Sequence, residues 1–247
     1  LHGIVADTAE HLAELIGKVA DTDQSINIHT YFQEYTFDII SRMVMGQKQS
    51  NMFHNENIDA LKRVFTGDAN KVFLPVADAF SYFYHDVQSL YMAIGSFIDN
   101  PIARLRDIIA KEVDKRIRSR VELVYSGLEA DESKDFIDML LDIHSDEELD
   151  ESEQWNRDEN IKIIKQLSRE EIVAHCMAFI LAGFDTTATS LSFLTYELVK
   201  HPEILRKVQE EIDQHCADDV SYETLNNLKY TECVIKETLR MYPLSGA

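Results

Sequence analysis

The sequence predicts a mainly α-helical fold. Apolar residues recur at the i, i+3, i+4 and i+7 spacing of amphipathic helices along most of the 247 residues. No segment shows the apolar–polar alternation of a β-strand that we would defend. One apolar stretch, Ser168 to Lys200, is long enough to cross a whole domain, because about 32 helical residues at about 1.5 Å each span about 48 Å. We therefore expect it to form the central helix.

Six shorter helices are predicted before this central stretch. Gly46 is expected to end the second, because glycine tolerates the left-handed conformation of a helix C-terminus. The basic side chains of the fifth alternate with acidic ones, so we expect that helix to present a solvated face. An aromatic-rich segment, 72–84, is interpreted as a buried connector, in preference to exposed aromatic side chains that would contact a ligand or lipid. The predicted helices cover residues 3–20, 31–45, 56–68, 87–97, 101–124 and 135–144.

An acidic segment precedes the central helix. Residues 145–160 contain eight acidic side chains and a single basic one, Arg157. Such a run cannot bury enough apolar surface to order itself, so we interpret it as a flexible surface loop. The whole chain carries a net charge of −20, which argues against a nucleic-acid partner.

The limits of the central helix are encoded locally. Ser168 and Glu171 have the spacing of a capping box, in which each side chain binds the other residue's backbone N–H. His201-Pro202 is expected to end the helix, because proline disfavours helical geometry in the residue before it. Beyond it, the apolar spacing predicts helices over 202–215, 222–228 and 230–241.

The centre of this helix departs from the usual composition of a core helix. Ala182-Gly183-Phe184-Asp185-Thr186-Thr187 places a glycine, an acid and two hydroxyls in an apolar run. We expect the small residues to leave a shallow groove, and the Thr186 hydroxyl to bond the Ala182 carbonyl. One interpretation is a close helix crossing in which Asp185 pairs with an arginine. The other is a functional site, because several local rules fail together.

Three motifs in order resemble the cytochrome P450 family. Ala182–Thr187 is similar to its A-G-x-[DE]-T-T oxygen-activation segment. Lys236–Pro243, about 52 residues later, is similar to its E-T-L-R-x-x-P helix, and 196–212 resembles the helix between them. The resemblance implies a P450-like helical fold and a haem-thiolate monooxygenase of the microsomal animal type. It also implies that 1–247 form one partial domain, about the middle half of a longer protein.

The resemblance assigns roles to six residues. Asp185 and Thr186 would be catalytic, with Asp185 passing protons from solvent and Thr186 hydrogen-bonding bound oxygen. Ala182 and Gly183 would form the groove that faces oxygen and haem. The remaining two, Glu237 and Arg240, would be a structural ion pair that supports the haem region together with an arginine from a later segment.

The three cysteines do not match the iron ligand of this family. That ligand lies in a glycine-rich F-x-x-G-x-x-x-C-x-G loop, whereas Cys176, Cys216 and Cys233 lie in helical patterns without those glycines. We interpret each as an ordinary buried thiol and expect no metal ligand in this chain. Their odd number and spacing also argue against a disulfide framework and a zinc site. We therefore expect the isolated chain to be inactive and not to hold haem by itself.

The resemblance further implies the partners of the complete protein. These are haem, O2, an apolar small-molecule substrate and a reductase, on the cytosolic face of the endoplasmic reticulum membrane. Membrane association would come from an N-terminal anchor outside these residues, because no signal peptide or run of 18 apolar residues occurs in the chain. The alternative is a non-catalytic helical scaffold derived from the same fold. A longer reading frame with the cysteine loop would favour the enzyme.

Overall fold

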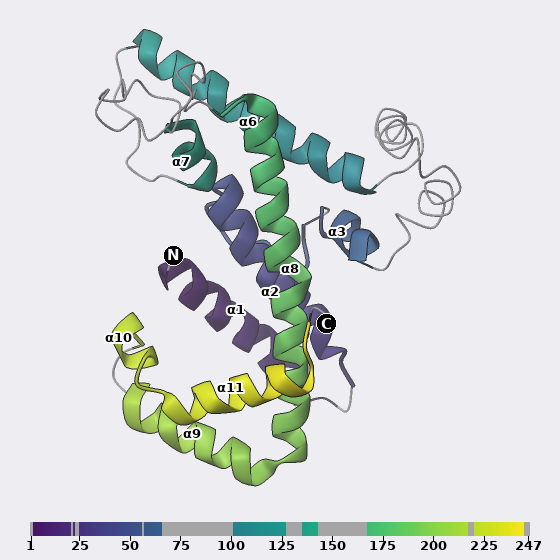
Figure 1. Cartoon of the computed structure of the whole chain (residues 1–247), viewed down its shortest axis with the longest axis vertical. Coiled ribbons are helices and arrows are strands. Elements are labelled where there is room, and N and C mark those ends of the chain that lie inside the picture. The colour runs from purple at the N-terminus through teal and green to yellow at the C-terminus, as the bar shows by residue number, and fades with distance from the viewer. Residues whose placement is uncertain are drawn as a thin grey trace, which may run out of the picture. The chain divides into compact units, whose positions relative to one another are not determined.

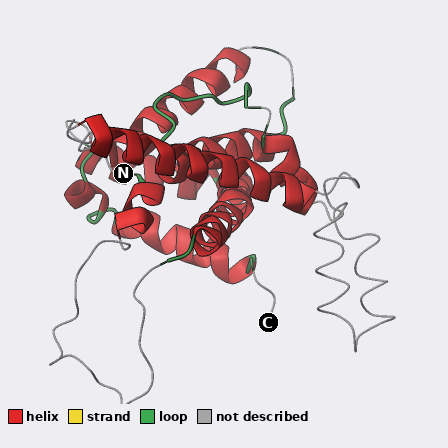
Figure 2. Ribbon diagram, turned by 90° about the horizontal axis from the view of Figure 1, so that it is seen from above, coloured by secondary structure: helices red, strands yellow, loops and turns green. Residues whose placement is uncertain are grey.

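A computed structural model describes residues 2–20, 22, 25–55, 57–65, 101–126, 135–142, 167–216 and 220–244. Every regular element in these residues is a helix, and the same ranges contain no strand (Figure 2). The prediction of a mainly α fold is confirmed. The predicted segments 72–84, 87–97 and 145–160 lie outside the described residues. The helices are α1 (His2–Ala20), α2 (Ile28–Met45), α3 (Ile58–Phe65), α6 (Pro101–Ser126), α7 (Phe136–Asp142), α8 (Arg169–Lys200), α9 (Pro202–Cys216), α10 (Tyr222–Leu225) and α11 (Lys229–Met241).

The residues predicted to begin and end helices do so in the structure. The Ser168 backbone N–H donates to Glu171 Oε2 at 2.7 Å, and the Glu171 N–H donates to Ser168 Oγ at 3.3 Å. α8 ends at Lys200 and α9 begins at Pro202. Gly46 follows the last residue of α2 with a φ of +66°. These short-range rules set the helix boundaries because they act within one turn of the chain.

The start of α2 differs from its predicted position by three residues. The Asn27 side-chain oxygen accepts a hydrogen bond from the His29 N–H at 3.2 Å, which is the geometry of an N-cap. The helix therefore begins at Ile28, and this shift places His29 inside its first turn.

The described residues form two compact units, each with its own core. The first contains residues 1–42, 49–55 and 180–247, and the second contains 43–48 and 56–179. α8 contributes residues 180–200 to the first unit and 169–179 to the second. The prediction that 1–247 form a single partial domain remains a prediction.

In the first unit, α2 packs along α8. Phe184 of α8 is fully buried, and its ring meets the Phe37 ring of α2 edge-on at 6.0 Å between centroids. α1 is tied to α2 by polar contacts, because the buried Thr8 hydroxyl donates to Asp38 Oδ2 at 3.2 Å and accepts from Arg42 Nη1 at 3.0 Å. α11 runs alongside α9 (Figure 1).

In the second unit, α6 packs against α3 and α7. Its apolar face buries Ile109 and Val113 completely. The prediction that the basic residues of α6 are solvated is wrong for two of the seven, Arg116 and Arg120, which follow Ile109 and Val113 by seven positions and so lie on the same side of the helix. The side chains of Arg116 and Arg120 are only 23% and 31% exposed. They bind three aspartates that begin or belong to α7, namely Asp135, Asp138 and Asp142.

α8 alone among the described helices is long and apolar enough to cross a membrane, with a mean hydropathy of 1.4 over 18 residues. The same length and composition are typical of the central helix of a soluble fold. Here α2 covers part of α8, and Asp185 lies near its middle with polar partners from α2. We therefore interpret α8 as a core helix.

Candidate functional site

Thr186 lies on an open face of α8. Its hydroxyl donates to the Ala182 carbonyl at 2.5 Å, as the sequence predicted, and both residues are exposed. One turn further, the Ser190 hydroxyl donates to the Thr186 carbonyl at 2.9 Å. These three residues share a face because they are four positions apart. They form a strip of small side chains, which we call the open strip, with the Thr186 oxygen at its centre.

Gly183 does not belong to the open strip. A Cβ atom added at this position would collide with Ile40 Cδ1 of α2. The glycine therefore faces α2 and allows the two helices to approach closely. Of the two residues predicted to form the groove, Ala182 lies on the open face and Gly183 on the packed one. The close-crossing interpretation thus explains Gly183, and it leaves Ala182 and Thr186 unexplained.

Asp185 also faces α2 rather than the open strip. Its Oδ1 accepts a hydrogen bond from Gln33 Nε2 at 2.8 Å and lies 3.4 Å from His29 Nε2. The side chain is 23% exposed, so solvent still reaches it. Successive helical residues point about 100° apart, so Asp185 and Thr186 cannot share one face. The structure brings Asp185 together with a histidine and a glutamine of α2, which sequence analysis missed.

His29 makes a second contact with α8. Its Nδ1 lies 3.1 Å from Ser192 Oγ. Asp185 and Ser192 are seven positions apart, about two helical turns, so both reach the same residue of α2. One available signal was the i, i+4 spacing of His29 and Gln33, which puts both side chains on one face of α2. Nothing local in the sequence indicates which helix that face meets.

The predicted structural pair lies on α11. Arg240 donates from Nε and Nη2 to the two oxygens of Glu237, each at 2.7 Å. The hydrogen bonds from Arg240 lower the pKa of Glu237 below its usual value. The side chains of Glu237 and Arg240 are 56% and 71% exposed. In the part of the chain that the structure describes, this pair is bidentate and solvated.

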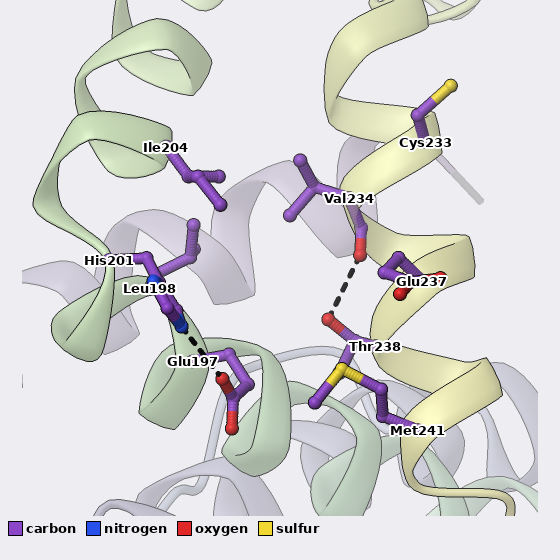
Figure 3. A pocket seen from close by; sticks show the side chains of 9 residues that line it. All are labelled: Glu197, Leu198, His201, Ile204, Cys233, Val234, Glu237, Thr238 and Met241. Atoms are coloured by element: carbon purple, nitrogen blue, oxygen red, sulfur yellow. Dashed lines mark hydrogen bonds and ion pairs between the residues drawn. The ribbon is translucent and has the colours of Figure 1, made fainter.

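A cavity of about 340 Å³ opens beside this pair (Figure 3). It lies between the end of α8, the start of α9 and one side of α11. Two contacts between residues four positions apart lie in its wall. The Thr238 hydroxyl donates to the Val234 carbonyl at 2.9 Å, and His201 Nε2 lies 3.5 Å from Glu197 Oε2. The lining is mostly apolar with a few charged groups: Glu197, Leu198, His201, Ile204, Cys233, Val234, Glu237, Thr238 and Met241.

Tyr242 joins the end of α11 to α8. Its ring stacks on Phe193 at 4.3 Å between centroids with a 5° interplanar angle, and its hydroxyl donates to Glu197 Oε1 at 2.7 Å. This hydrogen bond lowers the pKa of Glu197 and raises the pKa of Tyr242. The stacking fixes the C-terminal end of α11 on the helix that carries Asp185 and Thr186. Sequence analysis gave Tyr242 no such role.

The cytochrome P450 family model matches residues 1–247. The chain belongs to the cytochrome P450 family. It is 36% identical over 249 residues to the Caenorhabditis elegans cytochrome P450 CYP13A7, an alignment that covers 99% of this chain and 48% of the relative. It is 36% identical over 247 residues to CYP13A4 of the same organism, covering 98% and 47% of the two chains. With CYP13A6 of that nematode the identity is 39% over 232 residues, covering 90% and 43%.

The chain spans about half the length of the curated relatives it matches. Cytochromes P450 are haem monooxygenases, so the resemblance inferred from the three motifs is confirmed for the family. The roles of the individual residues are not tested by these similarities and remain predictions.

The described residues do not supply the iron ligand that a cytochrome P450 requires. Cys176 is fully buried, and burial raises its thiol pKa to about 11, which disfavours the thiolate that binds iron. Cys216 is half-buried at the end of α9 and Cys233 is exposed on α11, so the prediction of a buried thiol is wrong for these two. Within the described ranges, no three His, Cys, Asp or Glu side chains are grouped to hold a metal ion.

Proposed function

We propose that this chain is the oxygen-facing helical segment of a haem-dependent monooxygenase, which inserts one oxygen atom of O2 into an apolar small molecule. The observation that carries the proposal is the open strip, where Ala182 and Thr186 lie exposed on an apolar helix next to a carboxylate held by α2. Membership of the cytochrome P450 family supports it. Haem, held by residues outside the described part, would supply the oxygen-activating chemistry.

Thr186 is the residue that we propose to orient the oxygen ligand. Its only hydroxyl proton points to the Ala182 carbonyl, so its lone pairs face outward from the helix. In this state Thr186 accepts a hydrogen bond from a protonated ligand, and a rotation of the side chain turns it into a donor. The Ala182 methyl group leaves room for a diatomic molecule beside it. The site thus holds and orients a small polar ligand on an otherwise apolar wall.

Asp185 is the residue that we propose to bring protons from solvent. Gln33 donates to its Oδ1 and so fixes the carboxylate against α2. A rotation of the Asp185 side chain would move a proton from the α2 side of the helix towards the open strip. Asp185 and Thr186 therefore act in sequence rather than as a preformed pair. This order follows from their different faces on α8.

The partners of the complete protein belong to the same proposal. We infer an apolar small-molecule substrate, because the open strip carries no charged side chain. We infer a reductase as electron donor and attachment to the cytosolic face of the endoplasmic reticulum membrane from the family. Neither the reductase nor the membrane attachment requires a further contribution from the described helices.

Replacing Thr186 with alanine in the complete protein tests this proposal. Thr186→Ala removes one small polar group from the surface, so haem content and substrate affinity should stay close to wild type. Reducing equivalents should still be consumed, but more of them should appear as peroxide and fewer as product. Loss of one positioned proton donor typically slows the step it serves by about 10²- to 10⁴-fold. The measurement is product and peroxide formed per reducing equivalent.

Thr187→Ala is the matched control, because Thr187 is exposed one position further along the same helix. It should leave the ratio of product to peroxide unchanged. If Thr187→Ala uncouples the enzyme and Thr186→Ala does not, the assignment is displaced by one residue. If neither variant changes the ratio, the open strip is a packing surface and the proposal is wrong.

A further inference from the structure

The cavity between α8, α9 and α11 has a nearly buried carboxylate in its wall (Figure 3). Glu197 keeps only 9% of its accessible surface, and its Oε1 accepts hydrogen bonds from Tyr242 Oη at 2.7 Å and Lys200 Nζ at 3.3 Å. None of the described residues donates a hydrogen bond to its Oε2, and His201 Nε2 lies 3.5 Å away without forming one. A nearly buried carboxylate oxygen without a hydrogen bond is costly, so Oε2 is the atom at which this cavity favours a donor from a ligand.

The other polar groups of the cavity wall also act as acceptors. Hydrogen bonds from neighbouring side chains lower the pKa values of Glu197 and Glu237, so both carboxylates are ionised at neutral pH. The Thr238 hydroxyl donates its single proton to the Val234 carbonyl, so its oxygen can only accept a further hydrogen bond. Among the described residues that line the cavity, none is a lysine or an arginine. The wall therefore favours a positively charged donor and disfavours an anion.

The cations that pair with these two carboxylates approach them from outside the cavity. Lys200 binds Glu197 and Arg240 binds Glu237, but neither cation belongs to the lining. Their side chains are 48% and 71% exposed, so water and salt screen their charges. The interior of the cavity thus keeps its negative character although both carboxylates are paired.

The remaining lining residues form an apolar enclosure of limited size. Ile204 of α9 and Val234 of α11 point towards each other across the cavity, and Met241 extends from α11 towards Glu197 (Figure 3). The volume of about 340 Å³ is at the lower end of the range for small-molecule sites. At about 30 Å³ for each non-hydrogen atom, the volume that a water molecule takes in the liquid, roughly ten such atoms fit.

We propose that this cavity binds an amphiphilic cation, with an ammonium group on Glu197 Oε2 and a small aliphatic or aromatic body between α9 and α11. The ammonium group supplies the hydrogen-bond donor that Oε2 lacks, and the apolar body covers Ile204 and Val234. The site uses neither Asp185 nor Thr186, so the inference does not depend on the function proposed above.

Binding of phenethylammonium to the complete protein tests this inference. Phenethyl alcohol has the same size without the charge, and phenylacetate carries the opposite charge. The probes are titrated against protein labelled with ¹³C at the methionine methyl groups, and the signal of Met241 is identified by its loss in Met241→Leu. The haem is kept ferrous with carbon monoxide bound, so that the amine cannot occupy the iron and a shift of the Met241 signal reports the cavity.

The Met241 signal should shift in a saturable manner with phenethylammonium. Phenethyl alcohol should bind about 10- to 100-fold more weakly, because it replaces a charge-assisted hydrogen bond with a neutral one, and phenylacetate should cause no shift. Met139, an exposed methionine of α7 that does not line the cavity, is the internal control, and its signal should not move.

Two variants separate the contact with the ammonium group from the shape of the cavity. Glu197→Gln removes the charge but can still accept a hydrogen bond from Tyr242, so it should abolish the preference for phenethylammonium and leave the affinity for phenethyl alcohol unchanged. Glu210→Gln, at an exposed residue of α9 outside the cavity, should change neither affinity. Val234→Phe fills the space without touching the carboxylate and should weaken both probes by about 10-fold or more, because the apolar body loses its place.

Three results would overturn the inference. A Met241 signal that does not move would mean that another part of the complete protein fills the cavity. Equal affinities for the cation and the alcohol, or a preference that persists in Glu197→Gln, would mean that the carboxylate does not select the ligand. Equal shifts of Met139 and Met241 would mean that the probe adsorbs to the surface at many places.

Discussion

Two groups of charged side chains use the same chemistry in different surroundings. On α6 and α7, Arg116 and Arg120 bind Asp135, Asp138 and Asp142, and the side chains of Asp135 and Asp138 are only 8% and 11% exposed. We call this group the aspartate network. On α11, by contrast, the Glu237–Arg240 pair is more than half exposed. Both groups contain guanidinium hydrogen bonds to carboxylates at 2.6 to 2.8 Å.

The comparison shows that hydrogen-bond geometry does not determine what an ion pair contributes. An exposed pair exchanges water contacts for protein contacts at little net gain, whereas removing one partner from a buried group leaves a charge without compensation. The Glu237–Arg240 pair, which belongs to a family motif, should therefore contribute less to the stability of the described residues. The aspartate network, which belongs to no motif, should be the stronger one.

The largest effect should follow removal of Asp138 from the aspartate network. Asp138 binds Arg116 Nη1 and accepts from Arg120 Nε and Nη2 at 3.1 and 2.8 Å. Asp138→Ala leaves two half-buried guanidinium groups without their shared acceptor. Breaking a buried ion pair costs about 3–5 kcal/mol, and the remaining exposure of the arginines places our expectation near the lower end. The measurement is the free energy of unfolding by urea.

Asp107→Ala on the same helix is the control for this prediction. Asp107 pairs with Arg106 at 3.2 Å, and both side chains are nearly half exposed. Its removal should change the free energy of unfolding by less than about 1 kcal/mol. Equal losses for the two variants would break the comparison, because burial would then not explain the difference.

An intermediate effect is expected at Glu211, a carboxylate bound by backbone donors instead of arginine. Its oxygens accept from the N–H groups of Tyr230 and Thr231, each at 2.7 Å, and thereby cap the start of α11. Burial raises the pKa of Glu211, but these hydrogen bonds outweigh burial and lower it. A lowered pKa in the folded state means that the stabilisation is present above the unfolded value of about 4.3 and is lost as pH falls through the folded value.

Glu211→Gln should therefore flatten the acid limb of the stability profile. As the pH falls below about 4.3, the thermal midpoint of wild type should decrease, and that of Glu211→Gln should decrease less steeply. Glu210→Gln, at an exposed neighbour paired with Arg206, should reproduce the wild-type slope. Parallel slopes for wild type and Glu211→Gln would contradict this, because they would show that the cap binds the ionised carboxylate no more tightly than the protonated one.

Much of the fold followed from local rules in the sequence. Ser168 with Glu171, Gly46 and Pro202 each fixed a helix boundary, because capping and proline sterics act within a few residues. The Thr186 hydroxyl bond to the Ala182 carbonyl was predictable for the same reason. Helix periodicity supplied the remaining elements of the described ranges to within a few residues.

Contacts between distant segments could not be predicted in this way. His29 and Ser192 are 163 positions apart, and no periodic pattern indicates that α2 meets α8 at Asp185. Gly183 was assigned to a groove, whereas Ile40 from α2 occupies that side of the helix. Arg116 and Arg120 of α6 were predicted to be solvated because acidic residues alternate with them along the helix, whereas their partners in the structure lie on another element. Each difference arises from packing between elements, which sequence spacing does not encode.

The smallest effect on the chain should come from the Glu237–Arg240 pair. Arg240 lowers the pKa of Glu237 by hydrogen bonding, yet both groups remain in contact with water. At about 0.15 M salt, where charges are screened over about 8 Å, Glu237→Gln should leave the urea midpoint of the isolated chain unchanged at neutral pH. A small decrease should appear only at low salt, whereas the loss in Asp138→Ala should persist at high salt, because buried pairs are screened less. In the complete protein the same Glu237→Gln should reduce haem retention if a later arginine joins the pair, as the family resemblance implies. A salt-independent loss in the isolated chain as large as that of Asp138→Ala would contradict the comparison, since an exposed pair would then stabilise the fold as strongly as a buried network.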